Sequence, residues 1–233
     1  MNNNFSAMIL AAGYGKRMLP LTNEIPKPLI QVNNVSLLKN NIDFLLKLGC
    51  KKIVINTHYK HEQILEFIDK FYNASNILIS YEKKILDTGG GVKNAINYFD
   101  SKKILVTNCD IFWTKTNAKD VKNLILNFDP LSLCKLLLVD IEKANGINKE
   151  NGDFFIEKNL VKRWKPGNKI FFYSGLQILD LEILDKFKEK NFSFNKVWDY
   201  LIENKSLYGS VMKSNWYHVG DLKGLKTAIN YIG

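Results

Sequence analysis

The sequence predicts an α/β fold built on a doubly wound, mostly parallel sheet with a smaller extension. Strand-like and helix-like patterns alternate from residue 6 to residue 141, in the order β-α-β-α-β-α-β-α-β. Short connections of this kind join parallel strands through helices. Hydrophobic residues make up 46% and charged residues 24%, which is normal for a globular protein, and 233 residues are enough for one large domain.

Each element of the first half rests on a local pattern. Apolar runs predict strands at residues 6–11, 52–56, 77–81, 103–107 and 133–141. A first helix is expected between Ser36, a favoured N-cap residue, and Gly49, which follows its last apolar positions. Amphipathic spacing predicts further helices at residues 61–72, 91–99 and 118–128. Residues 12–28 are expected to form a long loop after the first strand.

The second half is less regular. Its patterns predict a hairpin at 153–164, a strand at 170–179, helices at 181–190 and 195–203, a strand at 206–212 and a final helix at 221–232. We expect this half to extend the same sheet and to form a wall over the functional site.

The formal charge of +10 has two possible explanations. One is a polyanionic partner, and the other is a composition rich in lysine. Only two of the 33 basic residues are arginines, Arg17 and Arg163, and the lysines are scattered rather than gathered in a stripe. This distribution favours a solvated surface over a nucleic-acid interface. An arginine at position 17 therefore needs a reason, and a planar phosphate ligand is one.

Several features indicate a cytoplasmic protein without a membrane partner. Cys50, Cys109 and Cys134 form neither a C-x-x-C pair nor a zinc spacing, as expected in a reducing compartment. The longest apolar runs are far too short for a membrane span, and residues 1–6 lack the basic start of a secretory signal.

The turn after the first strand has a composition suited to phosphate. It reads Leu10-Ala11-Ala12-Gly13-Tyr14-Gly15-Lys16-Arg17 and continues to Pro26-Lys27-Pro28. A dinucleotide fingerprint would need a third glycine, and a P-loop would need Ser or Thr after the lysine. Two glycines let backbone N–H groups approach phosphate oxygens, while Arg17 and Lys27 add positive charge. The alternative is an ordinary surface loop rich in glycine and proline.

This segment resembles the signature of the sugar-1-phosphate nucleotidyltransferases, Leu-Ala-Ala-Gly-x-Gly-x-Arg followed by Pro-Lys-Pro-Leu, and the order of the later motifs is similar too. The resemblance implies a Rossmann-like, GT-A-like fold in a single domain over residues 1–233, with a nucleotide-binding half (1–130) and a sugar-binding and C-terminal half (131–233). It also implies catalytic roles for Arg17, Lys27 and Asp110. By the same resemblance, the nucleotide contacts Leu10, Ala11, Ala12, Gly13, Gly15 and Arg17.

Asp110 is the candidate metal ligand. It follows a buried strand, and ligands bind beyond the carboxyl ends of such strands. By the resemblance it binds Mg²⁺, with Cys109 in place of the usual glycine. The family's second ligand is an Asp in Trp-x-Asp-x-Gly-Thr, where this chain has His218. Asp221 is the other candidate, although it also has the position of a helix N-cap. The second ligand therefore stays open.

The segment Leu86-Asp87-Thr88-Gly89-Gly90-Gly91 most resembles the short N-acetylmuramate-1-phosphate uridylyltransferases. This likeness implies that Thr88 and Gly89 lie at the base and Asn108 near the ribose. It implies sugar contacts from Lys27, Asp140, Gly152, Asp153, Ser174 and Gly175. Independently of the resemblance, a glycine inside an apolar strand, as at 175, indicates a bulge or a close approach of a ligand.

These readings predict transfer of a nucleotidyl group from a nucleoside triphosphate to a sugar 1-phosphate, with pyrophosphate released. UTP with N-acetylmuramate 1-phosphate is favoured, in cell-wall synthesis or peptidoglycan recycling. GTP with mannose or heptose 1-phosphate comes second, and choline-phosphate cytidylyl transfer is more distant. The rivals are a glycosyltransferase, for which an Asp-x-Asp motif is missing at residues 110–112, a nucleic-acid-binding module and a non-catalytic nucleotide-sugar sensor. The sequence does not indicate an oligomeric state.

Overall fold

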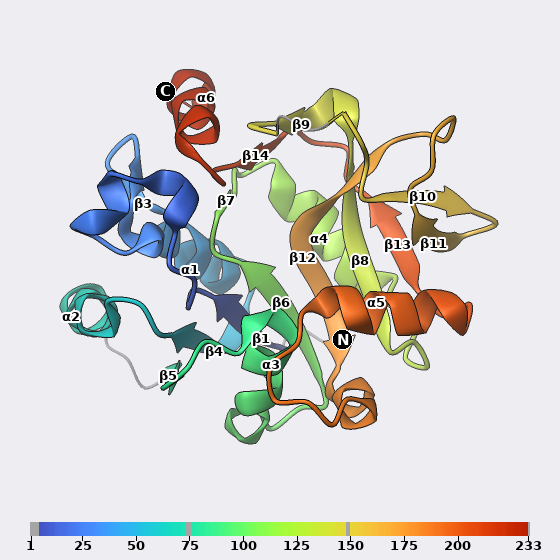
Figure 1. Cartoon of the computed structure of the whole chain (residues 1–233), viewed down its shortest axis with the longest axis horizontal. Coiled ribbons are helices and arrows are strands. Elements are labelled where there is room, and N and C mark those ends of the chain that lie inside the picture. Colours follow the sequence, from blue (N-terminus) through green and yellow to red (C-terminus); the bar gives the residue numbers. More distant parts are fainter. Residues whose placement is uncertain (1–4, 73–75, 148–149, 233) are drawn as a thin grey trace.

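A nine-stranded mixed sheet runs through the centre of the protein (Figure 1), seen in a computed structural model that describes residues 5–72, 76–147 and 150–232. Residues 1–4 lie outside the described residues. They belong to the segment in which the sequence predicts no secretory signal. The strand order is β10-β11-β13-β8-β12-β6-β1-β4-β5. In chain order these strands are β1 (Phe5–Leu10), β4 (Cys50–Thr57), β5 (Ile77–Tyr81), β6 (Lys103–Asn108), β8 (Cys134–Asp140), β10 (Phe154–Glu157), β11 (Leu160–Arg163), β12 (Phe171–Asp180) and β13 (Tyr208–Val211).

The first half of the sheet is parallel, as predicted. β1 pairs in parallel with both β4 and β6, and β5 pairs in parallel with β4. The chain therefore starts in the middle of this group and adds strands on either side. The carboxyl ends of β1, β4, β5 and β6 consequently lie at one edge of the sheet.

The expectation of a mostly parallel sheet is wrong for the second half. β12 lies between β6 and β8 and is antiparallel to both. β13 is parallel to β8, whereas β10 and β11 form the predicted antiparallel hairpin. A fully buried strand shows the same apolar run in either direction, so the sequence pattern could not distinguish an inserted antiparallel strand from a parallel one.

Helices cover both faces of the sheet. Alternate residues of β1 point to opposite faces, so that Ala7 and Ile9 belong to one apolar cluster and Met8 to another. The first cluster includes residues of α1 (Leu37–Lys47), α2 (His61–Phe71), α4 (Asn117–Leu126) and α6 (Leu222–Ile232). The second includes residues of α3 (Asp87–Asn94) and α5 (Phe194–Glu203).

Short elements complete the chain. The 3-10 helices are η1 (Lys16–Met18), η2 (Leu21–Asn23), η3 (Lys27–Leu29), η4 (Ile96–Tyr98), η5 (Ile141–Lys143) and η6 (Leu181–Lys186). The helix predicted at 181–190 is thus a 3-10 helix, and α3 begins four residues before the predicted start at 91. β2 (Gln31–Val32) pairs with β3 (Val35–Ser36), and β14 (Trp216–His218) lies between β7 (Ile111–Phe112) and β9 (Ala144–Asn145).

The pairing of β14 with β7 shapes the site. β14 and β7 are antiparallel, with His218 opposite Ile111. Residues near the C-terminus are thereby held beside the turn that follows β6. Within the described part of the chain, every helix is too short or too polar to cross a membrane.

Candidate functional site

A pocket of about 340 Å³ opens at the carboxyl ends of β1, β4, β5 and β6, the edge at which ligands bind in sheets of this kind. It is lined by Leu10, Ala11, Ala12, Gly13, Gly15, Lys16, Arg17, Lys27, Pro28, Asn56, Glu82, Ile85, Asp87, Thr88, Asn108, Cys109, Asp110 and Gly220. The pocket thus brings together the glycine-rich loop, the lysine between prolines and the acidic turn. Asp110, in this turn, is 83 residues from Lys27 in sequence.

The two loop glycines have different reasons to be glycine. Gly15 has a φ of +67°, and a Cβ there would lie 2.8 Å from Thr22 Cγ2 and 3.0 Å from Lys27 Cβ. Thr22 Oγ1 donates to the Gly15 carbonyl at 3.1 Å, which closes the loop. A Cβ at Gly13 would meet no atom within 4 Å. Gly15 is therefore required by the fold, whereas Gly13 leaves open space at the pocket.

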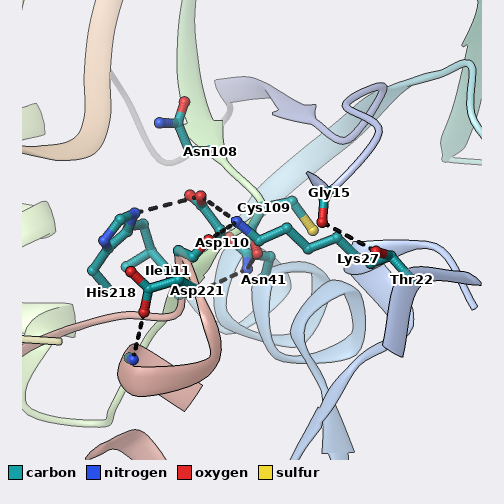
Figure 2. A network of polar contacts seen from close by, with 12 residues as sticks. Gly15, Thr22, Lys27, Asn41, Asn108, Cys109, Asp110, Ile111, His218 and Asp221 are labelled. Atoms are coloured by element: carbon teal, nitrogen blue, oxygen red, sulfur yellow. Dashed lines mark hydrogen bonds and ion pairs between the residues drawn. The ribbon is translucent and has the colours of Figure 1, made fainter. Parts of the chain in front are cut away.

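The two basic residues of the loop differ in their partners. The Arg17 side chain is exposed, lines the pocket and makes no hydrogen bond or ion pair with the described residues. Lys27 is largely buried; its Nζ forms an ion pair with Asp110 Oδ2 at 2.7 Å and donates to the Gly220 carbonyl at 3.3 Å (Figure 2). Arg17 is thus free to meet an anion, while Lys27 is already fixed beside the acidic turn.

A buried asparagine fixes the backbone around Asp110. Asn41, on α1 and 0% exposed, donates through Nδ2 to the Cys109 carbonyl at 3.2 Å and to the Ile111 carbonyl at 3.0 Å (Figure 2). Its Oδ1 accepts from Trp113 Nε1 at 3.0 Å. One side chain therefore satisfies the carbonyl groups on both sides of the carboxylate, and nothing in the sequence pattern marked it.

The surroundings of Asp110 keep it ionised. Burial raises the pKa of its carboxyl, but the Lys27 ammonium and the His218 imidazole outweigh this effect and hold the pKa well below its ordinary value. Cys109 is buried and burial raises the pKa of its thiol, so it is a packed thiol and not an activated nucleophile.

One oxygen of Asp110 suits a divalent cation. Oδ1 is buried and has no hydrogen-bond partner among the described residues, whereas Oδ2 faces Lys27. The described residues contain no group of three or more His, Cys, Asp and Glu side chains that could hold a metal ion. A cation such as Mg²⁺ fits this arrangement if water and substrate phosphates supply its other ligands, which is its usual mode of binding.

The structure distinguishes the two candidates for a second metal ligand. Asp221 Oδ1 accepts from Gly224 N at 2.8 Å, so this side chain caps α6. His218 Nε2 lies 3.4 Å from Asp110 Oδ2. Figure 2 shows the imidazole facing the carboxylate. The structure brings His218, and not Asp221, to the acidic turn.

Two of the pocket residues that escaped the sequence reasoning, Asn56 and Glu82, form a hydrogen-bond network. Asn56 accepts from Ala11 N at 2.8 Å and donates to Glu82 Oε1 at 2.7 Å, and Glu82 Oε2 accepts from Leu86 N at 2.9 Å. Burial raises the pKa of Glu82, although these hydrogen bonds oppose the shift. This network connects the ends of β1, β4 and β5. A signal was available, because each residue is a polar side chain at the carboxyl end of a predicted strand.

Thr88, expected at the base, and Asn108, expected near the ribose, line the pocket, whereas Gly89, also expected at the base, does not. A Cβ at Gly89 would lie 2.4 Å from Phe192 Cε2, so its small size serves packing against the segment before α5. Thr88 Oγ1 accepts from Phe194 N at 2.8 Å and thereby caps α5. The base contact expected at Gly89 stays a prediction, and the Phe192 ring explains why a side chain does not fit at this position.

Of the residues expected at the sugar, Lys27 lines this pocket, and the other five lie outside it, near the beginning of β12. The register of β12 against β8 shifts between Tyr173 and Gln177, and Gly175 has a φ of +81°. These two observations confirm the predicted bulge. A Cβ at Gly175 would lie 3.3 Å from Asn108 Cβ. Ser174 is fully buried, and its carbonyl accepts from Trp216 Nε1 at 2.8 Å. The bulge thus lies beside the pocket wall, but the Ser174 side chain is enclosed.

The other three gather near Phe171, the first residue of β12. Asp140 pairs with Phe171 in register and forms an ion pair with Lys169 at 2.6 Å. Asp153 Oδ2 accepts from Tyr173 N at 3.0 Å, and a Cβ at Gly152 would lie 3.0 Å from the Trp164 ring. Because β12 begins at the carboxyl end of β8 and beyond that of β6, these residues share an edge of the sheet with the pocket.

Comparison with known proteins agrees with this geometry. The model of the family described as Nucleotidyl transferase matches residues 6–233. N-acetylmuramate alpha-1-phosphate uridylyltransferase of Caulobacter vibrioides is 31% identical over 223 residues, covering 92% of this chain and 91% of that protein. Mannose-1-phosphate guanyltransferase of Debaryomyces hansenii is 29% identical; the match covers 93% of this chain but only 61% of the longer relative.

A solved structure shares the fold. HddC from Yersinia pseudotuberculosis, crystallised with GMP-PN, superimposes with a TM-score of 0.77, covering 98% of this chain and 100% of that chain. The identity is 22%, so the likeness concerns the arrangement of the elements. The overall arrangement of strands and helices therefore has a counterpart among solved structures.

Proposed function

The chain belongs to the nucleotidyl transferase family, and from this premise we propose that it transfers a nucleotidyl group from a nucleoside triphosphate to a sugar 1-phosphate. The observation that carries the proposal is the pocket itself, in which the Gly13–Gly15 loop, Arg17, Lys27 and Asp110 meet at the carboxyl edge of the sheet. Backbone amides, two cations and one carboxylate form a site for a triphosphate and its counter-ion.

In the proposed reaction, an ionised phosphate oxygen of the sugar 1-phosphate attacks the α-phosphorus in line. The bond from the α-phosphorus to the bridging oxygen breaks, and pyrophosphate leaves. The attacking oxygen carries no proton, so no strong general base is required, and catalysis consists of positioning and charge neutralisation. A bound divalent cation, Mg²⁺ by expectation from the sequence, would supply further neutralisation of phosphate charge.

The side chains have distinct proposed tasks. Arg17, exposed and without a partner among the described residues, binds the leaving phosphates in the planar manner of a guanidinium. Lys27, held by Asp110 and the Gly220 carbonyl, presents a fixed charge to the phosphates at the reaction centre. Asp110 keeps one oxygen for the cation.

The nucleotide we favour is UTP, with N-acetylmuramate 1-phosphate as acceptor and nucleotide-sugar supply to the cell wall as the role. The support is the match of similar length to the uridylyltransferase of Caulobacter vibrioides. GTP with mannose 1-phosphate is the alternative, supported by the relative from Debaryomyces hansenii at nearly the same identity. We place the enzyme in the cytoplasm, where both kinds of substrate would be available.

We further propose that the two halves of the chain divide the substrates. Residues 1–130 would hold the nucleotide, since every pocket-lining residue except Gly220 lies in this range. Residues 131–233 would hold the sugar. Within this second half, the sugar contacts would come from the loops around the beginning of β12, including Asp140, Asp153 and Gly175.

A substrate grid tests the function. The four nucleoside triphosphates are each incubated with N-acetylmuramate, mannose, glucose and heptose 1-phosphates, and pyrophosphate is measured. We expect release with one nucleotide above all, UTP first. Absence of pyrophosphate from every pair, with binding of a nucleotide sugar retained, would indicate the non-catalytic sensor instead. A steep loss of binding to long polyanions with salt would indicate a nucleic-acid-binding module.

A further inference from the structure

The imidazole of His218 is held in a fixed position against the acidic turn. Its ring is stacked on Trp216, with centroids 5.5 Å apart and planes 4° apart. Trp216 is 2% exposed and is anchored by its hydrogen bond to the Ser174 carbonyl. A Cβ at Gly220 would lie 2.2 Å from His218 Cε1, so the ring also packs closely against that glycine. The imidazole therefore has little freedom to turn away.

The position of this ring suits two ligands of one ion. His218 Nε2 lies 3.4 Å from Asp110 Oδ2. Lys27 already contacts this oxygen, so the oxygen left for an ion is Oδ1 of the same carboxylate, which has no hydrogen-bond partner among the described residues. Two donor atoms about 2.1 Å from one metal ion lie about 3.0 Å apart at an angle of about 90° and about 4.2 Å apart when they are opposite each other. A carboxylate that meets the imidazole at this distance is therefore placed to share an ion with it through Oδ1. The pairing of β14 with β7 fixes this spacing through the backbone, because His218 lies opposite Ile111, the residue after Asp110.

The charge at the site is also informative. The carboxylate of Asp110 already faces the Lys27 ammonium at 2.7 Å, so the negative charge left for a cation is small. Mg²⁺ depends on anionic or strongly polar oxygen ligands, and imidazole is a poor ligand for it. Ions of the first transition row bind imidazole nitrogen more readily.

We propose that His218 and Asp110 together ligate the divalent ion of this site, and that this donor pair shifts its preference from Mg²⁺ toward ions of the first transition row, with Mn²⁺ as the probe. The inference deepens the proposed function and rests on it for the purpose of the ion. It assigns His218, rather than Asp221, as the second protein ligand.

Pulsed electron paramagnetic resonance of bound Mn²⁺ gives a direct test, because an imidazole nitrogen on the ion produces ¹⁴N modulation. The full-length protein is measured with Mn²⁺ alone and with Mn²⁺ and UTP. We expect nitrogen coupling in the wild type and its loss in His218→Asp. The other two histidines provide matched controls, since His58→Gln and His61→Gln should keep the coupling.

Calorimetric titrations with Mn²⁺ and Mg²⁺ provide the second measurement. Replacing His218 by Asp should reduce the ratio of the Mg²⁺ to the Mn²⁺ dissociation constant by about tenfold, a modest effect for a change in a metal site. Wild-type protein without nitrogen coupling, or with no bound Mn²⁺ in either sample, would overturn the inference. So would an unchanged ratio in His218→Asp.

The two proposals can fail separately. Pyrophosphate release in the substrate grid without nitrogen coupling would remove only the role of His218. Nitrogen coupling without pyrophosphate release from any substrate pair would support the metal pair and reject the nucleotidyl transfer.

Discussion

Lys27 Nζ lies 2.7 Å from Asp110 Oδ2, although 83 residues separate the two in sequence. This ion pair joins the loop after β1 to the turn after β6, at the edge where the parallel strands end (Figure 2). Both side chains are largely buried, so the pair is shielded from solvent and salt. It holds a cation and a carboxylate where a triphosphate and its metal ion would meet.

Arg17 should be the more important of the chain's two arginines for activity. We expect Arg17→Ala to reduce kcat/KM by about 10³-fold, as is typical when an arginine that neutralises phosphoryl charge is lost. Arg17→Lys should recover only part of this, because an ammonium cannot bind two oxygens in a plane. Steady-state pyrophosphate assays provide the measurement.

Arg163 offers the matched control. It forms an ion pair with Asp199 at 2.7 Å and does not line the pocket. Arg163→Ala should leave kcat/KM within about twofold of the wild type. It should lower stability modestly, because the guanidinium also packs over the Phe154 and Trp198 rings. Equal losses in the two variants would contradict the role of Arg17.

The two loop glycines should separate folding from binding. Gly15→Ala places a Cβ 2.8 Å from Thr22 Cγ2 at a φ of +67°, so we expect a lower melting temperature. Gly13→Ala meets no atom within 4 Å and should keep the melting temperature while raising the KM for the nucleotide. Thermal unfolding and initial rates on both variants test this. A destabilised Gly13→Ala with unchanged KM would argue against a nucleotide at this loop.

Asn41 should position Asp110 through the backbone. Asn41→Asp keeps an acceptor for Trp113 Nε1 but removes the donor to the Cys109 and Ile111 carbonyls. Unsatisfied buried carbonyl groups should cost about 1–3 kcal/mol of stability. We also expect weaker binding of Mn²⁺, measured on protein that urea titration shows to be folded.

A neighbour supplies the comparison for Asn41. Asn40 bonds to the backbone of Trp113 on both its oxygen and its nitrogen, away from the turn at Asp110. Asn40→Ala should lower stability and leave the Mn²⁺ affinity nearly unchanged. If both variants weakened Mn²⁺ binding equally, the positioning role of Asn41 would be lost.

Glu82 should make stability depend on pH. Burial raises its pKa above the ordinary 4.5, against the opposing hydrogen bonds from Asn56 and Leu86. The folded state thus binds this proton more tightly than the unfolded chain. Its contribution to stability is fully present below pH 4.5 and is lost as the pH rises through the raised pKa.

Glu82→Gln removes this titration. Urea unfolding of the wild type and the variant from about pH 4 to about pH 8 should show the wild type losing stability relative to the variant as the pH rises. A constant difference in unfolding free energy between the two proteins is also expected, because an amide cannot accept from both Asn56 and Leu86 as the carboxylate does. A difference in unfolding free energy that is independent of pH would show that the Glu82 pKa is not raised.

The comparison of sequence with structure shows which patterns were informative. The parallel strands from β1 to β6 and the bulge at Gly175 were predictable, because apolar runs and an interrupting glycine are local signals. The direction of β12 was not predictable, since burial on both faces gives the same run in either direction. The packing of Gly89 against Phe192 was not predictable either, because only the fold brings these two residues together.

By itself, the sequence determined the kind of chemistry. Glycines and basic residues follow one strand and an acid follows another, and such patterns can be recognised within a single chain segment. Only the tertiary structure decided which side chains complete the site. Asn41, Asn56, Glu82 and His218 come from α1, β4, the segment after β5, and β14. The sequence marked His218 as a candidate and placed Asn56 and Glu82 at the ends of predicted strands. It could not show which of these side chains meet, because their contacts depend on strand pairing and helix packing between distant segments.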